Sequence, residues 1–233
     1  MSPTTSPRVR ARLDRRLTLV AALLWPATAG AAGGADVVDD PFVETPGVCH
    51  IESWYVAPLD GGSLAHLGIG CTPKAIHRLE LDAAVERVTG GGTTELFEPG
   101  FKYTLLVIGK LSLGTEFTAA LDRRGRFGGA SLFVPLSYAL GKYTIVNLDI
   151  GAQRGAAADG GRDALYWGGQ IAQAFAPHFA AIGEVFGDNR HTPGVQGGLR
   201  WSPGPERFDF DLRASHGPDH AGTALTFGLT WRT

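Results

Sequence analysis

The sequence predicts an all-β fold, a transmembrane antiparallel up-and-down β-barrel of about twelve strands that follows a cleavable signal peptide. Three observations support this prediction. A short secretory segment opens the chain, no later apolar segment reaches the roughly 18 residues of a membrane helix, and stretches of about ten residues alternate between apolar and polar side chains. The 33 glycines and 14 prolines among 233 residues also suit a fold with many turns.

The first residues have the three parts of a secretory signal peptide. Five arginines between Arg8 and Arg16 precede the apolar run from Leu17 to Trp25, and the small residues 27–32 follow. Cleavage is expected after Ala29 or Ala31. We therefore predict a signal peptide over residues 1–31, a flexible N-terminal linker over 32–46 and the barrel over 47–233.

The charge of the exported chain argues against a nucleic-acid partner. The whole chain carries 21 basic and 23 acidic residues. Removal of the signal peptide takes away five arginines and Asp14, which leaves 16 basic and 22 acidic residues. A surface that binds nucleic acid needs the opposite sign.

The predicted strands follow from a two-residue alternation of side chains. The alternation is clearest over 208–215, where Phe, Phe, Leu and Ala share one face and Asp, Asp, Arg and Ser share the other, and over 224–232. Pro99 and Pro135 fall inside two predicted strands, where proline cannot donate to the ladder. The twelve predicted strands are 48–57, 63–71, 77–88, 94–107, 111–122, 128–139, 143–152, 163–175, 179–188, 193–202, 206–215 and 222–232.

The connections and the aromatic residues predict how this barrel lies in a membrane. The predicted connections after odd-numbered strands are mostly longer than those after even-numbered strands, as in barrels with short periplasmic turns and both termini in the periplasm. Aromatic residues gather at strand ends, where two bands at the headgroup levels are expected. The predicted periplasmic band is Tyr138, Tyr143, Phe175, Phe179, Trp201, Phe208 and Trp231, and the opposite band is Trp54, Tyr55, Phe127, Tyr166 and Trp167.

The C-terminal part of the chain resembles a known group of membrane proteins. The segments 184–188, 194–200, 209–212 and 227–231 resemble porin-like outer-membrane β-barrel proteins of proteobacteria, a broad group that includes outer-membrane transporters associated with aromatic-compound degradation. The resemblance implies a cell outer membrane location in a Gram-negative bacterium, with outer-membrane lipid and the barrel-assembly machinery as partners, but it names no solute. Such barrels usually end in an aromatic residue, whereas this chain adds Arg232 and Thr233 after Trp231.

The two cysteines are predicted to form a disulfide. If the first hairpin turns around Asp60, residues whose numbers sum to about 120 face each other, as Cys49 and Cys71 do. Opposed residues on antiparallel strands lie within the distance range of a disulfide. Export also provides an oxidising compartment.

The polar residues on the inward-facing side of the predicted strands form the candidate functional surface. They can form a salt-bridged plug that fills a narrow lumen, or they can line a constriction that selects small solutes by charge and size. The alternation leaves both interpretations open. The predicted lumen-lining residues are Glu80, Asp82, Lys102, Glu116, Asp149, Glu184, Arg200, Asp209, Asp211 and Arg213.

The sequence therefore favours a narrow pore or passive transporter for small solutes. One alternative is an outer-membrane lipid-modifying enzyme, for which Ser215 and His216 are the only tempting pair, although neighbours on a strand point to opposite faces. The other is a structural or adhesive barrel with a plugged lumen. No catalytic residue, metal site or cofactor is predicted, and the one compact histidine pair, His216 and His220, is assigned to a loop.

Overall fold

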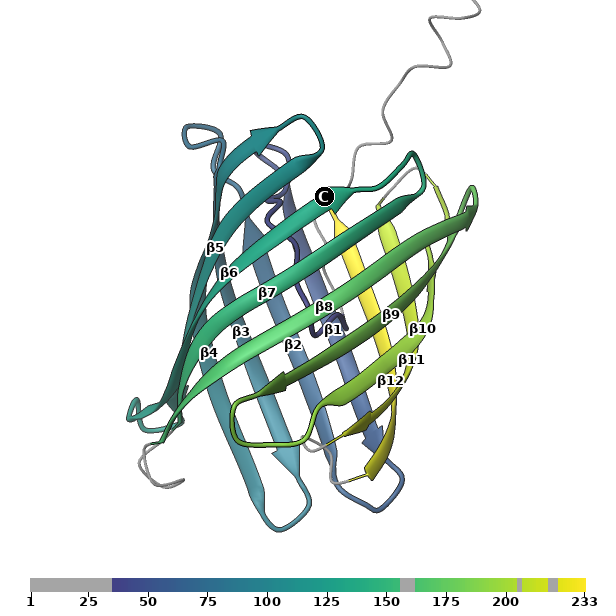
Figure 1. Cartoon of the computed structure of the whole chain (residues 1–233). Helices are drawn as coiled ribbons and strands as arrows, with labels where there is room; N and C mark the ends of the chain where they lie inside the picture. Colours follow the sequence, from purple (N-terminus) through teal and green to yellow (C-terminus); the bar gives the residue numbers. More distant parts are fainter. Residues whose placement is uncertain (1–34, 156–161, 205–206, 218–221) are drawn as a thin grey trace, which may run out of the picture.

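The computed structural model describes residues 35–155, 162–204, 207–217 and 222–233, so the predicted signal peptide over residues 1–31 lies outside the described residues. The described chain forms twelve antiparallel strands (Figure 1). No helix among these residues is long and apolar enough to span a bilayer. The strands are β1 (Cys49–Pro58), β2 (Ser63–Cys71), β3 (Leu79–Thr89), β4 (Thr93–Ile108), β5 (Leu111–Asp122), β6 (Phe127–Ala139), β7 (Thr144–Gly155), β8 (Asp163–Ala176), β9 (Phe179–Asp188), β10 (Gly194–Trp201), β11 (Phe208–Gly217) and β12 (Gly222–Arg232).

The strands close into a barrel in which each pairs with its neighbours in sequence and β1 pairs with β12. The closing pair runs from His50 opposite Arg232 to Pro58 opposite Ala224. Closure leaves no edge strand whose backbone N–H and C=O groups would face lipid without partners. The predicted all-β barrel of twelve strands is therefore confirmed, and the predicted strand bounds lie within three residues of the observed ones.

Pro135 is accommodated at a local break in pairing. It pairs with Asp149 of β7, but on the other side the ladder between β5 and β6 omits Gly114 and Thr115 opposite Pro135 and Val134. A proline has no N–H to donate, so a gap in one ladder removes the conflict. Its side chain is fully buried.

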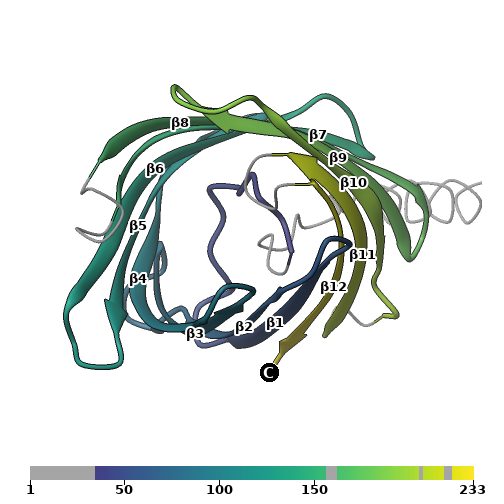
Figure 2. The same ribbon diagram turned by 90° about the horizontal axis from the view of Figure 1, so that it is seen from below.

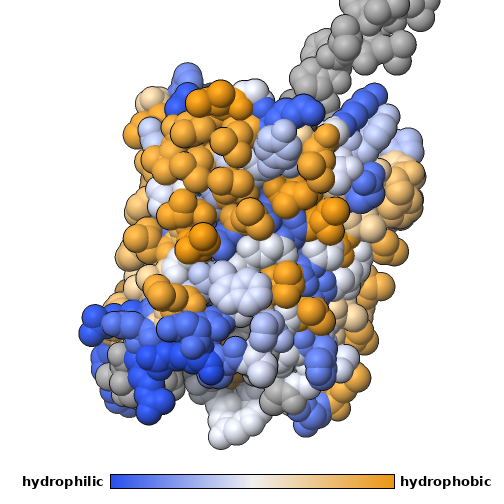
Figure 3. Space-filling view, in the orientation of Figure 1, coloured by the Kyte–Doolittle hydropathy of each residue, from blue (hydrophilic) through white to orange (hydrophobic). Residues whose placement is uncertain are grey.

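The outer face of the barrel is apolar. Hydrophobic side chains cover most of the upper part of the view in Figure 3, and hydrophilic ones gather near the β5–β6 connection at the lower end. This distribution matches a lipid-facing belt with a polar end. The exposed apolar side chains include Leu67, Ile69, Leu81, Val85, Phe97, Leu132, Ile150, Ile171, Leu199, Leu212 and Phe227.

The aromatic band at the end that holds the termini is present on the outer face. All seven side chains of the predicted periplasmic band are exposed, and Phe175, Phe179 and Trp201 stack in a row. The prediction for the opposite band is wrong for two residues: Trp54 stacks on His66 inside the barrel, and Tyr166 packs there against Phe133. The alternation of a strand explains this, because each is adjacent to another aromatic residue, Tyr55 or Trp167, that takes the outward position.

The predicted difference in loop length is not seen. Connections after odd-numbered strands have three to seven residues, and those after even-numbered strands have two to seven. The connection between β2 and β3 is longer than predicted because hydrogen bonds from Ile76 N to Pro73 O and from Leu79 N to Ile76 O form turns where the third strand was expected to begin. The start of β1 and the end of β12 lie at the same end of the barrel, as an even strand number requires.

Residues 35–44, predicted as part of a flexible linker over 32–46, instead lie inside the barrel. Figure 2, which looks along the barrel, shows this segment within the ring of strands. Val38 is fully buried, and Ala35, Asp40 and Glu44 are each less than a tenth exposed. We call residues 35–44 the inserted segment.

The disulfide between Cys49 and Cys71 is present, and the two residues pair directly in the ladder between β1 and β2. The predicted register is therefore confirmed. The bridge lies beside the seam of the barrel, where Thr233 N donates to Cys49 O at 2.9 Å. Arg232 and Thr233, which follow the terminal aromatic residue, thus complete the pairing of β12 with β1.

We expect loss of this disulfide to destabilise the barrel without changing its fold. A bridge between residues 22 apart stabilises by about 3 kcal/mol in the loop-entropy model. Urea unfolding of C49S/C71S in detergent should show a loss of that size, and alkylation of the native wild-type protein should find no free thiol. Two alkylatable thiols in the native protein would contradict the bridge.

Candidate functional site

Three glycines in the barrel wall give the inserted segment room to cross the lumen. A Cβ at Gly228 of β12 would lie 3.3 Å from Ala35, one at Gly168 of β8 would lie 2.6 Å from Val38, and one at Gly114 of β5 would lie 2.9 Å from Pro41. The segment therefore passes from the β12 wall to the β8 wall and then to β5. Side chains at these positions would push it away from the wall.

Strands β8 to β10 hold the first half of the segment by hydrogen bonds. The backbone N–H groups of Val37 and Val38 both donate to Glu184 Oε1 at 3.0 Å. The Gln170 side chain donates to Val38 O at 3.1 Å, and the Gln196 side chain donates to Ala35 O at 2.8 Å. Buried backbone groups without strand partners need such bonds, and these side chains supply them.

A buried ion-pair network holds Asp36. Arg200 and Arg213 each place Nη2 2.7 Å from an oxygen of this carboxylate, and both also pair with Asp211. The Arg213 side chain is fully buried. Opposite charges taken out of water stay charged only when they are paired in this way, so Asp36 balances the two arginines.

The second half of the segment is bound by β3, β4, β7 and β12. Asp39 forms an ion pair with Lys102, and its N–H donates to Asp149 Oδ2 at 2.8 Å. Glu44 N donates to Glu80 Oε2 at 2.9 Å. Arg232 links Glu44 to β11 by pairing with Asp209. Contacts therefore extend along the length of the segment.

The structure places all ten predicted lumen-lining side chains inside the barrel. Seven of them contact the inserted segment directly: Glu80, Lys102, Glu116, Asp149, Glu184, Arg200 and Arg213. Asp209 and Asp211 pair with the arginines that hold it. Asp82 lines an adjoining cavity. Much of the predicted set thus anchors a segment that sequence reasoning assigned to a linker.

The lumen keeps open space on both sides of the inserted segment. A cavity of about 680 Å³ at the end away from the termini is lined by residues of β4 to β9 that include Glu98, Thr118 and Arg154. A cavity of about 520 Å³ lies at the end that holds the termini and includes Phe42 of the segment in its wall. We call these the loop-end vestibule and the terminus-end vestibule.

Between the vestibules, a middle cavity of about 220 Å³ lies between the inserted segment and a wall formed by β1 to β5, with Phe133 of β6 and Asp149 of β7 at its edge. It shares Glu98 and Thr118 with the loop-end vestibule. Its lining has eight carboxylates and only one amino group, that of Lys102: Asp36, Asp39, Glu52, Glu80, Asp82, Glu98, Glu116 and Asp149. Such a lining attracts cations and repels anions.

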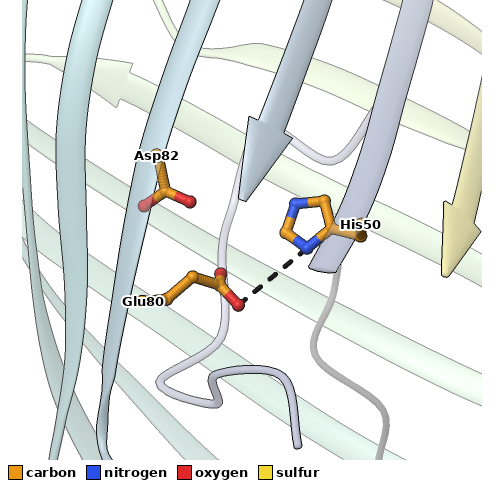
Figure 4. Close-up of side chains that lie close together, drawn as sticks. All are labelled: His50, Glu80 and Asp82. Carbon is orange, nitrogen blue, oxygen red and sulfur yellow. Dashed lines mark ion pairs between the residues drawn. The ribbon is translucent and has the colours of Figure 1, made fainter. Parts of the chain in front are cut away.

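Two inward-facing histidines that sequence reasoning did not select also reach this cavity. His50 lies beside Glu80 and Asp82 (Figure 4), and His66 lies beside Glu86 and Glu98. The predicted hairpin register already placed His50 opposite Gly70 and Trp54 opposite His66, so the signal was the parity of these positions.

The residues considered for enzymatic or loop metal chemistry do not assemble. Ser215 is buried inside the barrel, and His216 is exposed and contacts Thr223 at 3.2 Å, so the two side chains lie on opposite faces, as the alternation predicts. His178 contacts Ser202 O, and His191 pairs with Asp188. His220 lies outside the described residues.

Comparisons with known proteins agree with the barrel. The model of a family described as "Uncharacterised conserved protein UCP029691" matches residues 20–232. A search among curated proteins finds no match.

Among solved structures, the chain is similar to the KdgM porin in complex with disordered oligogalacturonate, with 13% identity over 78% of this chain and 98% of that chain and a TM-score of 0.62. It is also similar to the NanC porin, with 8% identity over 78% and 98% of the two chains and a TM-score of 0.59. The COG4313 outer membrane channel from Pseudomonas putida F1 matches with 10% identity over 85% and 100% and a TM-score of 0.58. At these identities the likeness establishes the fold alone, a closed antiparallel β-barrel of the porin type.

We expect removal of Arg213 to destabilise the protein strongly. R213M would leave Asp36, Asp211 and Glu184 without part of their counter-charge, and breaking a buried pair in this way costs about 3–5 kcal/mol. Urea unfolding in detergent measures the loss. R123M, which removes an arginine whose side chain is 74% exposed, is the matched control and should change stability little. Equal stabilities of the two variants would contradict the role of the buried network.

Proposed function

The chain belongs to the family described as uncharacterised conserved protein UCP029691, and we propose that it is a narrow outer-membrane pore for small solutes. The observation that carries this proposal is the row of three cavities along one lumen. A barrel whose interior served only as a packed core would have no need of vestibules at both ends. The fold it shares with porins and channels supports the same proposal.

We infer that the inserted segment sets the width of this pore. It occupies the level between the two vestibules, and the middle cavity is the space left beside it. Its anchors are ion pairs and hydrogen bonds, which can exchange with water when the segment moves. Solutes that pass would therefore be small.

The charge of the middle cavity indicates cations as the preferred solutes. The arginines on the β10 to β12 side are paired with carboxylates. Strands β1 to β5 instead contribute one amino group, that of Lys102, and five carboxylates to the middle cavity: Glu52, Glu80, Asp82, Glu98 and Glu116. The excess negative charge stands where the path is narrowest. Selectivity rings of acidic side chains in cation channels work by the same electrostatics.

The predicted signal peptide supports export, and the apolar belt supports insertion into outer-membrane lipid by the barrel-assembly machinery. Placement of the termini at the periplasmic end would direct the loop-end vestibule outward.

A structural barrel with a closed lumen is the second candidate function. The many contacts of the inserted segment favour it, since a segment anchored on both halves of the wall can block passage altogether. Under this alternative the vestibules would be dead ends.

Conductance of the purified protein in planar bilayers separates the two functions. We expect the wild-type protein to give small, discrete channel events. A variant that lacks residues 35–44 should conduct roughly two- to fivefold more, because the middle cavity widens when the segment is absent. Circular dichroism and the heat-induced shift in electrophoretic mobility would verify its fold. If neither folded protein gives channel events, the pore is contradicted and the barrel with a closed lumen remains.

Substitution of the cavity carboxylates tests the preference for cations. E52Q/E116Q should lower the cation-to-anion permeability ratio by roughly twofold, since both side chains line the middle cavity and both changes keep the shape of the side chain. E95Q is the matched control, because Glu95 pairs with Arg123 at the loop end. Reversal potentials in a salt gradient give the ratio. An unchanged ratio in a conducting double variant would show that these carboxylates do not set selectivity.

A further inference from the structure

The inner wall formed by β1 to β4 contains two groups of histidine and carboxylate side chains. The His50 cluster is His50, Glu80 and Asp82, and the His66 cluster is His66, Glu86 and Glu98. Within each cluster, one candidate ligand atom from each residue lies within 4.8 Å of the others. Figure 4 shows His50 reaching from β1 toward Glu80 and Asp82 of β3 across the intervening strand β2.

The register of the strands explains how residues of different strands meet. His50 of β1 pairs with Gly70 of β2, and Gly70 pairs with Asp82 of β3. The outer two residues of this row therefore have only a glycine between them. His66 pairs directly with Glu86.

The glycines of β2 leave space between the ligand atoms. A Cβ at Gly70 would lie 2.5 Å from Asp82 Oδ1 and 2.8 Å from His50 Nε2. A Cβ at Gly68 would lie 2.9 Å from His66 Nε2 and 3.3 Å from Glu52 Oε1. Each histidine thus borders, together with a carboxylate, a space that any other residue on β2 would fill.

The two histidines are buried, and three of their four ring nitrogens have no hydrogen-bond partner among the described residues. Both side chains are 8% exposed, and His50 Nδ1 and both ring nitrogens of His66 have no hydrogen-bond partner. His66 Nε2 lies 3.8 Å from Glu52 Oε1, and His66 Nδ1 lies 4.0 Å from Glu86 Oε2. His50 Nδ1 lies 3.7 Å from Glu44 Oε1 of the inserted segment and 3.9 Å from Glu80 Oε2. Buried polar atoms are normally satisfied, so a partner of another kind is indicated.

These distances suit a metal ion better than a shared proton. A protonated histidine draws a carboxylate oxygen to about 2.7–2.9 Å. A metal bonded to both atoms permits a separation of up to about 4.2 Å, because its bonds to nitrogen and to oxygen are each about 2.0–2.2 Å long. The separations within the two clusters, His50 Nδ1 to Glu80 Oε2 and His66 Nδ1 to Glu86 Oε2, both lie between these limits.

We propose that this wall binds two divalent transition-metal ions, one at the His50 cluster and one at the His66 cluster. One imidazole with two carboxylates is a ligand set for Zn²⁺, Mn²⁺ or Fe²⁺, and the imidazole disfavours Mg²⁺ and Ca²⁺, which take oxygen ligands. The eight carboxylates of the middle cavity, whose lining includes both histidines, attract a doubly charged ion.

If the barrel conducts, the two clusters are successive binding sites for such an ion along the path through the middle cavity. This consequence rests on the proposed pore, whereas metal binding itself does not. With two sites in one narrow cavity, an ion that binds at the first site would repel the ion at the second site and speed its release.

Binding is tested on the intact protein in detergent by equilibrium dialysis against Zn²⁺. About 1 mM Mg²⁺ is present as a competing divalent ion, at about physiological ionic strength. We expect two Zn²⁺ per wild-type chain, one for H50Q, one for H66Q and none for H50Q/H66Q. Co²⁺ should give visible absorption bands that these variants lose in the same order. H178Q, which changes an exposed histidine, should bind as the wild type does.

A second variant keeps every ligand and fills the space between two of them. G70A should abolish binding at the His50 cluster alone, because its methyl group would lie against Asp82 Oδ1 and His50 Nε2. G197A, where the nearest atom to the added Cβ is 3.6 Å away, is the matched control and should bind two ions.

Fewer than two ions on the wild-type protein, displacement by Mg²⁺, or unchanged binding by a folded H50Q/H66Q variant would overturn the proposal. Its failure is distinct from that of the pore. A protein that binds Zn²⁺ but gives no conductance in bilayers supports the metal sites and contradicts the pore. A protein that conducts but binds no Zn²⁺ supports the pore and contradicts the metal sites.

Discussion

Closure of the sheet by the pairing of β1 with β12 is the constraint from which the remaining structure follows. Lipid offers no hydrogen bonds, so all strand backbones must pair with one another, and a closed barrel does this without an edge. Alternation along each strand then sends every second side chain inward. Because the outward positions must be apolar, the polar residues of the strands collect in a lumen that is too narrow to hydrate them all. Their charges have to be balanced by other protein groups.

The inserted segment supplies part of that balance. Its Asp36, Asp39 and Glu44 pair with Arg200 and Arg213, Lys102, and Arg232 respectively, so the barrel and the segment neutralise each other. An unpaired buried arginine would be costly, and a segment without partners for its backbone would be equally costly. Each therefore stabilises the other in a place that neither could occupy alone. In the proposed pore, the same contacts would hold the segment where it sets the width of the path.

The fold could be predicted from sequence because its rule is local: parity along a strand fixes which side chains point inward, and turns fix where strands end. Parity placed Asp211 and Arg213 inside, and the same rule places Trp54 and Tyr166 there.

The inserted segment could not be predicted in this way. It lies in the stretch 30–46, whose Gly, Ala, Asp and Pro residues are typical of a linker. Its position depends on glycines such as Gly168 and Gly228, far away in sequence, whose role is visible only once the barrel has closed. The His50 cluster lies between these cases. Its register was predictable, but the space between its ligand atoms depends on Gly70, which has no side chain that could indicate a site.

The two halves of the lumen differ in how completely their charged side chains are paired. This difference indicates which wall would interact with a solute. On the β8 to β12 side, Arg200, Arg213 and Arg232 pair with carboxylates of the wall and of the inserted segment, so little charge remains there to act on a solute. On the β1 to β5 side, glycines replace the side chains that would fill the space, and the carboxylates there outnumber the cations. A barrel optimised for stability alone would have distributed its charges evenly. An excess of negative charge beside an open space is costly in a low dielectric unless cations enter it, so this wall is where a solute would contribute to the stability of the protein.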